Sequence, residues 1–440
     1  MNAPPCHASA VRLTPPRPSP KGQTNTAPRL TNQAAPPGGC STMHRDTPAA
    51  PARNDLPARN DLIDTLRAFA LIGVFMVHMF EQFEIYWTAP QQTLTHILIT
   101  TLMMGKAFAL LALSFGLSFY ILMDRATRRG EDFSRRFVWR MLLLAVIGIV
   151  HGLIYRGDIL IVLALLGIPL IPFYRASTGV LAGAAALFLL QPWMWLQIAI
   201  AASGAPWANT PPNHWTDPAL AIYQTGDLVA VLKTNLFEAQ VTKWWFFIET
   251  GRISLVMGLF LIGLLLGRSG FFDAPQRFVG VRRIALAVLA ITALALYLAK
   301  PHLTALLPAE PKPGMARVMA GNLLGGWFDM ALMGTYVLLI VEAYLGLAGK
   351  ALGWLAPMGR MTLTFYVGQS LIWVPVFYGF GLDAWKTLPQ GTALWLGVGF
   401  MMLQAVIAQL WFRRFAYGPL EWLWRVATYR TWTVPFVRRA

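Results

Sequence analysis

The sequence predicts an all-α fold, a polytopic bundle of about ten transmembrane helices. Of the 440 residues, 56% are hydrophobic and only 13% are charged, whereas a soluble domain averages about 25% charged residues. Apolar runs recur along the chain, each near the length of about 20 residues that a helix needs to cross the hydrocarbon layer. Lys and Arg gather in the short segments between these runs, as the positive-inside rule requires. We therefore expect the lipid bilayer to be the solvent of this protein.

The N-terminal stretch, residues 1–60, is rich in Pro, Ala, Thr and Asn and has no apolar periodicity. Such a composition buries too little surface to offset the entropy of ordering, so we predict a disordered Pro-rich tail. The tail has no apolar run of the kind found in a signal peptide. We expect residues 1–42 to be dispensable, with Met43 as an alternative start.

Ten apolar segments follow, within a predicted transmembrane helical domain of residues 61–430. The tight Arg156-Gly157 turn makes the third and fourth segments an antiparallel hairpin, and one long hydrophilic loop, 203–245, follows the fifth. The predicted helices span 62–84, 98–123, 137–155, 158–174, 178–202, 246–268, 281–300, 318–345, 361–381 and 390–412.

Charge predicts the orientation of the bundle. Basic residues follow the second, sixth and eighth segments and recur after the last one, from Arg413 to Arg439 and so into the basic tail at 431–440, whereas the stretch after the first segment begins with Glu81 and Glu84. Both termini are therefore predicted to be cytoplasmic and the 203–245 loop extracytoplasmic. The same bias accounts for the net charge of +16. Nucleic-acid binding is not expected, because no basic face with interleaved aromatic residues lies outside these loops.

The first apolar segment contains ionisable residues, which are costly in lipid and are therefore candidates for function. Asp64 and Arg67 lie three residues apart and can pair on one helix face, although anchoring to lipid headgroups would also explain them. His78 lies eleven residues beyond Arg67, about 16 Å further along a helix. It can accept and return a proton near neutral pH, or it can be a hydrogen-bonded structural residue.

A second candidate group, formed by His151, Arg156 and Asp158, lies where the third and fourth segments meet. On the predicted topology these residues lie at the same end of the bundle as His78. One site can therefore gather two histidines, an arginine and a carboxylate. The alternative is a hairpin held by an Arg156–Asp158 ion pair.

Arg135, Arg136 and Arg140 form a third group at the cytoplasmic start of the third segment. Guanidinium groups match phosphate oxygens, so these residues can clamp a phosphorylated donor such as coenzyme A. Positive-inside bias explains them equally well. Both cysteines, Cys6 and Cys40, lie in the tail with no CxxC pair or Cys/His cluster, so no metal site is expected.

Several short motifs occur in an order that resembles the YeiB-like family of bacterial membrane proteins, defined mostly as a domain of unknown function. The resemblance covers about 62–430 and implies a multi-pass protein of the bacterial inner membrane. The motifs are Leu66-Arg67-Ala68-Phe69-Ala70-Leu71, Ser114-Phe115-Gly116, His151 followed by Gly157-Asp158-Ile159-Leu160, Glu249-Thr250-Gly251-Arg252, Gly359-Arg360 through Gln369-Ser370, and Gly418-Pro419-Leu420-Glu421-Trp422-Leu423-Trp424-Arg425.

That family is in turn distantly similar to membrane-bound acyltransferases, which move an acyl group from a cytoplasmic donor to an extracytoplasmic sugar. Those enzymes carry an Arg and a His on the first helix, spaced as Arg67 and His78 are here. They also carry paired arginines near a later helix, but here Arg136 and Arg140 are four residues apart rather than three. The resemblance implies that Arg67, Arg136 and Arg140 hold the phosphates of an acyl-CoA co-substrate.

The leading functional hypothesis is thus a transmembrane acyltransferase that uses acyl-CoA and acts on a glycan or small-molecule acceptor. His78 would be the general base or a proton relay, and His151 and Asp158 would orient the acceptor. A proton-coupled transporter is the main alternative, because buried ionisable groups also suit a proton path. We find no convincing internal repeat, which transporters often show. The third alternative is a non-catalytic structural membrane protein.

Overall fold

The computed structural model describes residues 60–438, and the predictions for the N-terminal tail lie outside this range. Within the described residues the chain forms helices and no strand longer than an isolated bridge, so the predicted all-α class is confirmed. The α-helices are α1 Asp61–Phe80, α2 Leu94–Leu102, α3 Lys106–Arg128, α4 Ser134–Ile154, α5 Leu160–Gly167, α6 Leu170–Arg175, α7 Thr178–Leu190, α8 Pro192–Ala202, α9 Ala219–Thr225, α10 Leu228–Leu236, α11 Glu238–Glu249, α12 Arg252–Arg268, α13 Val279–Ala305, α14 Met315–Leu345, α15 Gly349–Gly353, α16 Ala356–Gly359, α17 Thr362–Phe377, α18 Gln390–Arg414 and α19 Pro419–Tyr429.

All ten predicted apolar segments are helical, but fewer than ten are long enough to cross a membrane. In the described chain, seven helical stretches pass by length and hydropathy, or eight if the bent pair α11 and α12 forms one span. The fourth predicted segment is divided into the short helices α5 and α6, and the ninth is the 16-residue α17. The estimate of about ten spans was therefore too high, because an apolar run does not reveal where a helix breaks.

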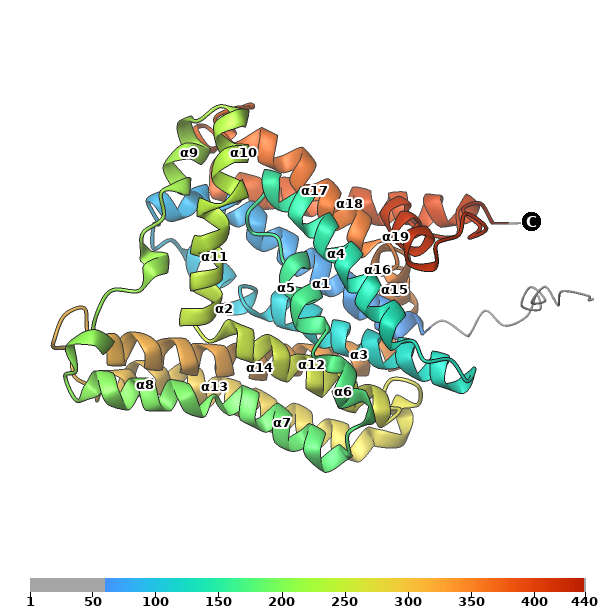
Figure 1. The fold of residues 1–440 in the computed structure, drawn as a ribbon, viewed down its shortest axis with the longest axis horizontal. Helices are drawn as coiled ribbons and strands as arrows, with labels where there is room; N and C mark the ends of the chain where they lie inside the picture. The colour runs from blue at the N-terminus through green and yellow to red at the C-terminus, as the bar shows by residue number, and fades with distance from the viewer. Residues whose placement is uncertain (1–59, 439–440) are drawn as a thin grey trace, which may run out of the picture. The chain divides into compact units, whose positions relative to one another are not determined.

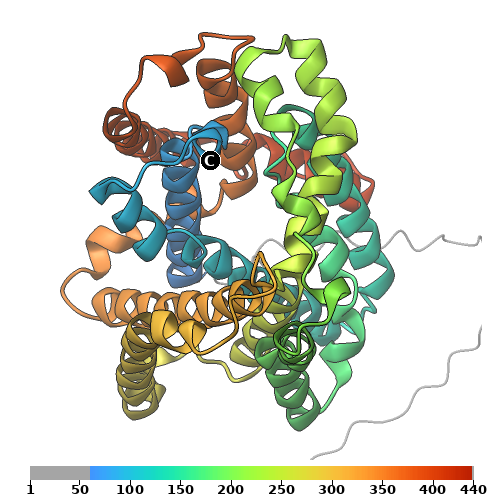
Figure 2. The same cartoon turned by 90° about the vertical axis from the view of Figure 1, so that its left-hand side faces the viewer.

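The outside of the bundle is apolar, as a lipid-facing surface requires. Only 11% of the most apolar window in the α13 stretch is buried within the protein. In Figure 2, α13 and α18 are seen nearly end-on at the outside of the bundle. Six large aliphatic residues of α13 are each more than half exposed: Val281, Ile284, Val288, Ile291, Leu294 and Leu298.

Helices α3 and α12 pack closely in the interior through glycines. A Cβ atom added to Gly116 would overlap the carbonyl group of Phe260, and one added to Gly263 would overlap that of Leu113. Small residues let transmembrane helices approach to backbone contact. This packing fixes α3, which contributes much of the candidate site described below.

The predicted hydrophilic loop 203–245 is largely helical, which corrects the sequence-based expectation. It contains α9, α10 and the start of α11. These helices are short and partly polar, so they lack the long apolar runs that revealed the others. In Figure 1, α9 and α10 lie at the opposite end of the bundle from α15, α16 and α19.

Both ends of the described chain lie at the same end of the bundle, where α1 begins and α19 lies (Figure 1). Residues after α19 fold back, with a bridge between Phe415 and Val437 and a hydrogen bond from the Trp422 indole to the Val434 carbonyl. We call this end of the bundle the arginine-rich end, after the cluster of five arginines described next. Its assignment to the cytoplasm stays a prediction from the distribution of charge.

Candidate functional site

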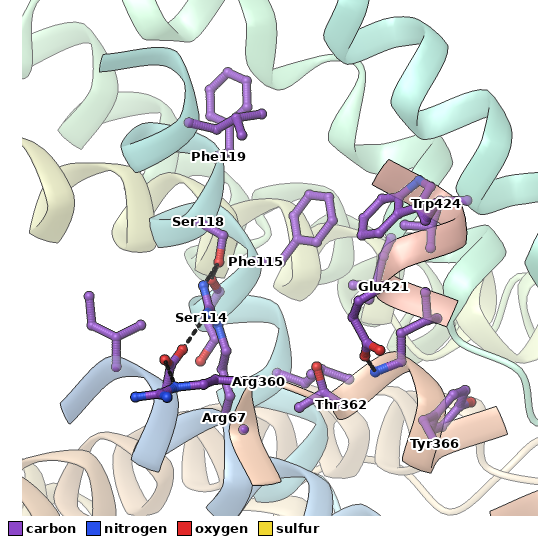
Figure 3. A pocket seen from close by; sticks show the side chains of 18 of the residues that line it. Arg67, Ser114, Phe115, Ser118, Phe119, Arg360, Thr362, Tyr366, Glu421 and Trp424 are labelled. Atoms are coloured by element: carbon purple, nitrogen blue, oxygen red, sulfur yellow. Dashed lines mark hydrogen bonds and ion pairs between the residues drawn. The ribbon is translucent and has the colours of Figure 1, made fainter. Parts of the chain in front are cut away.

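A cavity of about 410 Å³ lies among α1, α3, α4, α5, α17 and α19. Its walls are mostly aliphatic and aromatic and include Leu71, Val74, Phe115, Leu144 and Leu163. Polar groups gather toward one part of it, and Figure 3 shows Arg67, Arg360 and Glu421 around this part. The cavity also contains five arginines, which are Arg67, Arg125, Arg140, Arg360 and Arg425.

Two of these arginines are bound to carboxylates. Arg67 donates to Asp64 at 2.8 Å and to the Ser118 hydroxyl at 2.6 Å. Arg360 reaches Asp64 at 3.2 Å and Asp61 at 2.5 Å, which ties the start of α17 to α1. The predicted Asp64–Arg67 pair is thus confirmed, and its carboxylate is shared by two guanidinium groups.

None of the other three arginines is in an ion pair within the described chain, and two of them lie against aromatic rings. The Arg140 guanidinium lies 3.6 Å from the centre of the Trp424 ring, and that of Arg425 lies 4.5 Å from the Tyr417 ring. Within residues 60–438, neither these two nor Arg125 has a carboxylate within the 4.0 Å of an ion pair. Three positive charges at the cavity therefore remain available to an anionic ligand.

Arg136, the partner predicted for Arg140, does not line the cavity. It is half exposed, lies 3.5 Å from Glu131, and stacks near the rings of Phe133 and Tyr429. Four residues separate it from Arg140, yet α19 packs beside α4 and supplies Arg425 in its place. Arg135, the third member of the predicted group, does not line the cavity either, so only Arg140 of the three does. Sequence alone assigned Arg125, Arg360 and Arg425 to positive-inside bias, because only tertiary packing brings them together.

The other predicted residues do not line the cavity but meet beside it, next to the lining residues Ile159 and Tyr366. His151 Nδ1 and Asp158 Oδ1 are 2.8 Å apart, and both side chains are buried. A carboxylate only accepts hydrogen bonds when ionised, so Asp158 fixes the proton of neutral His151 on Nδ1. Among the described residues His151 Nε2 has no hydrogen-bond partner. The pair anchors α4 to the turn before α5, where the Ile161 amide also donates to Asp158.

Tyr155, which the sequence analysis did not single out, connects this pair to His78. Its hydroxyl lies 2.9 Å from His78 Nδ1, and its ring packs against both histidine rings. Burial raises the pKa of the Tyr155 hydroxyl well above its usual range, so the group stays protonated and can donate or accept. No spacing in the sequence signals this contact, because it joins residues 77 positions apart.

The face of α1 that lines the cavity leads directly to His78. Arg67, Leu71 and Val74 line the cavity, and His78 follows Val74 by four residues, one turn further on the same face. Tyr366 also lines the cavity, and its ring centre lies 5.1 Å from that of His151. The cavity therefore contains five arginines, and its lining on α1 stops one turn before His78.

The turn that follows His78 is strained and is held by an ion network. Gln82, Phe83 and Glu84 all have positive φ angles, of 47°, 51° and 82°, which non-glycine residues rarely adopt. Arg156 binds the Glu84 carboxylate and lies 2.6 Å from Asp217. The predicted alternative of an Arg156–Asp158 pair is thus wrong. Burial opposes the charge of Arg156, but Glu84 and Asp217 outweigh it and hold its pKa well above the usual range.

Comparison with known proteins supports the resemblance to the YeiB-like family. The family described as "Protein of unknown function (DUF418)" matches residues 266–431. This match covers the C-terminal part of the described chain. The matched region contains α13 to α19. It supplies Arg360, Tyr366, Trp424 and Arg425 to the cavity, whereas His78 and His151 lie before it.

Similar proteins extend the likeness over most of the chain. The chain is 26% identical to the "Uncharacterized protein YxaH" of Bacillus subtilis, over 85% of this chain and 95% of that protein. It is 25% identical to the "Uncharacterized protein YeiB" of Escherichia coli, over 84% of this chain and 97% of that protein. An uncharacterised protein of Bacillus acidopullulyticus is 23% identical over 85% of this chain and 95% of its own length. These names carry no activity, so function is argued from the site.

Proposed function

We propose that this protein is a transmembrane acyltransferase that moves an acyl group from acyl-CoA to a hydroxyl of an extracytoplasmic glycan or small molecule. The observation that carries the proposal is the α1 face, which runs from the arginine cluster along the apolar walls to His78. A donor with an anionic head and an apolar tail matches such a cavity in both polarity and order. The proposal places the arginine-rich end in the cytoplasm of a bacterium, at its inner membrane.

The donor would bind through its phosphates and its acyl chain. Arg125, Arg140 and Arg425 have no carboxylate partner within the described chain, and guanidinium groups bind phosphate oxygens through charge-assisted hydrogen bonds. The aliphatic walls would take the acyl chain out of water. Arg67 would position the donor indirectly, because its own hydrogen bonds go to Asp64 and Ser118.

His78 would take the proton of the acceptor hydroxyl. If its Nδ1 donates to the Tyr155 hydroxyl, its Nε2 carries the free lone pair of a general base. The acceptor oxygen would then form a bond to the thioester carbonyl carbon, the carbon–sulfur bond would break, and the proton on His78 would pass to the leaving thiolate. Atoms and charges balance without a metal or another cofactor.

The sequence predicts that His151 and Asp158 orient the acceptor. In the structure they would instead act as positioning residues that do not contact it. Both side chains are buried, so an acceptor does not reach them in this conformation. Their pairing holds the turn that carries Tyr155, which in turn orients His78. His151 Nε2 has no hydrogen-bond partner in the described chain, so His151 is the second candidate base.

Binding of octanoyl-CoA to the purified full chain in detergent micelles tests the donor site. We expect Arg425→Gln to weaken binding about tenfold or more, because one charge-assisted contact to phosphate is lost. Isothermal titration calorimetry measures the change. Coenzyme A and octanoate, each with only one half of the donor, should bind more weakly than octanoyl-CoA.

Arg283→Gln is the matched control. It removes the same charge as Arg425→Gln, but at an exposed position on α13. It should leave octanoyl-CoA binding unchanged. Equal affinity in wild type, Arg283→Gln and Arg425→Gln would show that the cavity arginines do not bind the donor.

The transporter alternative has one observation in its favour. The apolar helices α11 and α12 are bent by 68° at a short break, and interrupted helices of this kind are common at the substrate sites of transporters. Uptake of a solute by vesicles that contain the protein, without any acylated product, would favour this alternative.

A further inference from the structure

A second cavity, of about 180 Å³, lies where α11, α12, α13 and α14 meet and shares no lining residue with the first. It is lined by two cations, Arg252 and Lys300, and by Asp329. Asn322 and Thr250 add further polar groups. Nothing in the proposed acyl transfer uses this cavity.

The one carboxylate in this cavity is already neutralised. Asp329 forms an ion pair with the buried Lys106 at 2.6 Å. Its carboxylate also occupies the position where a Cβ of Gly105, the residue just before α3, would lie, which places it at the start of α3. The positive end of a helix stabilises an acidic group there. Asp329 is therefore committed to Lys106 and to the start of α3.

Arg252 and Lys300 consequently lack acidic partners. The contacts of the Arg252 guanidinium are with the rings of Phe246 and Phe108, at 4.6 and 5.9 Å from the ring centres. Across residues 60–438, neither Arg252 nor Lys300 has an ion pair within 4.0 Å. Gly325 leaves space for the Lys300 ammonium, since a Cβ there would lie 3.2 Å from Nζ. With Lys106 and Asp329 cancelling each other, Arg252 and Lys300 leave a charge of +2 at this cavity.

The backbone adds to this positive charge. The break between α11 and α12 occurs at Thr250 and Gly251, where Gly251 has a φ of 72°. It turns the start of the 17-residue α12, with its unpaired first-turn amides, toward the cavity that Thr250 and Arg252 line. In membrane proteins such interrupted helix starts face anionic groups.

Uncompensated charges are expensive among apolar transmembrane helices, so partners are expected for them. A bound anion would satisfy Arg252, Lys300 and the α12 amides at once, and a dianion would match the charge of +2. The cavity is several times larger than the roughly 30 Å³ that one water occupies in the liquid. We propose that this cavity binds a small dianionic oxyanion, of the phosphate or sulfate class, between Arg252 and Lys300.

Inorganic phosphate is the probe for the test, at pH 8 and at an ionic strength held constant with sodium chloride. Calorimetric titration of the full chain in detergent should show saturable binding, and sulfate should compete with it. Arg252→Gln and Lys300→Gln should each weaken phosphate binding about tenfold or more, because each removes a charged donor. Lys300→Arg keeps the charge and should retain most of the affinity.

Arg283→Gln again provides the control and should bind phosphate as the wild type does. Should Arg252→Gln fail to fold, the wild type and Lys300→Gln still decide the matter. Absence of saturable phosphate and sulfate binding by the wild type would overturn the proposal. Unchanged affinity in a folded Lys300→Gln would do the same. Loss of phosphate binding in Lys300→Gln with intact octanoyl-CoA binding would separate this site from the proposed donor cavity.

Discussion

Acyl transfer by His78→Asn is expected to fall by about two orders of magnitude or more, with protein level and membrane insertion nearly unchanged. Asparagine keeps similar bulk and one hydrogen bond toward Tyr155, but it cannot accept the proton of the acceptor hydroxyl. The measurement is the amount of acylated envelope product in cells that carry each variant at equal protein level.

His151→Asn provides the comparison for this experiment. Because His151 is a positioning residue, its substitution should lower the rate less than that of His78. The His151→Asn protein should also be less stable than wild type, because the buried Asp158 loses its partner. Full activity in His78→Asn would remove the proposed base. A greater loss in His151→Asn at equal stability would move that role to His151.

Arg156→Met is expected to lower the free energy of unfolding by about 3–5 kcal/mol, the usual cost of leaving buried charges without a partner. Arg156 lies between Glu84 and Asp217, and the exposed fractions of the three side chains are 12%, 15% and 14%. The network holds the strained turn after α1 to the α4–α5 turn. Denaturant titration in detergent micelles measures the change.

Arg128→Met is the matched control, because its ion pair with Asp124 lies at the surface, with 77% of the Arg128 side chain exposed. That variant should lose less than about 1 kcal/mol. Equal stability of the two variants would show that the Arg156 network does not hold the turn.

The fold class was predictable because it depends on composition and on apolar periodicity, which are local properties. The breaks within helices were not predictable from these local properties. Gly251 ends one helix and begins another with a positive φ, yet Gly263 and Gly116 lie within straight helices and serve close packing. A glycine in an apolar run has the same appearance in both cases, so the sequence overestimated the number of spans.

The site was predictable where its residues are near one another in sequence. The Asp64–Arg67 pair follows from a spacing of three residues, and His151 and Asp158 flank one tight turn. The long-range contacts had no such signal. Tyr155 meets His78 across 77 positions of sequence, and Arg425 lies beside Arg140 at the cavity only because α19 packs against α4. Arg156 pairs with two distant carboxylates rather than with nearby Asp158 for the same reason.

The proposed acyl transfer is tested most directly by profiling the lipids and envelope glycans of a strain from which the gene has been deleted. Mass spectrometry should show the loss of one acyl modification, its return with the wild-type gene, and no return with His78→Asn. An unchanged set of acylated lipids and glycans in the deletion strain would contradict the enzyme account.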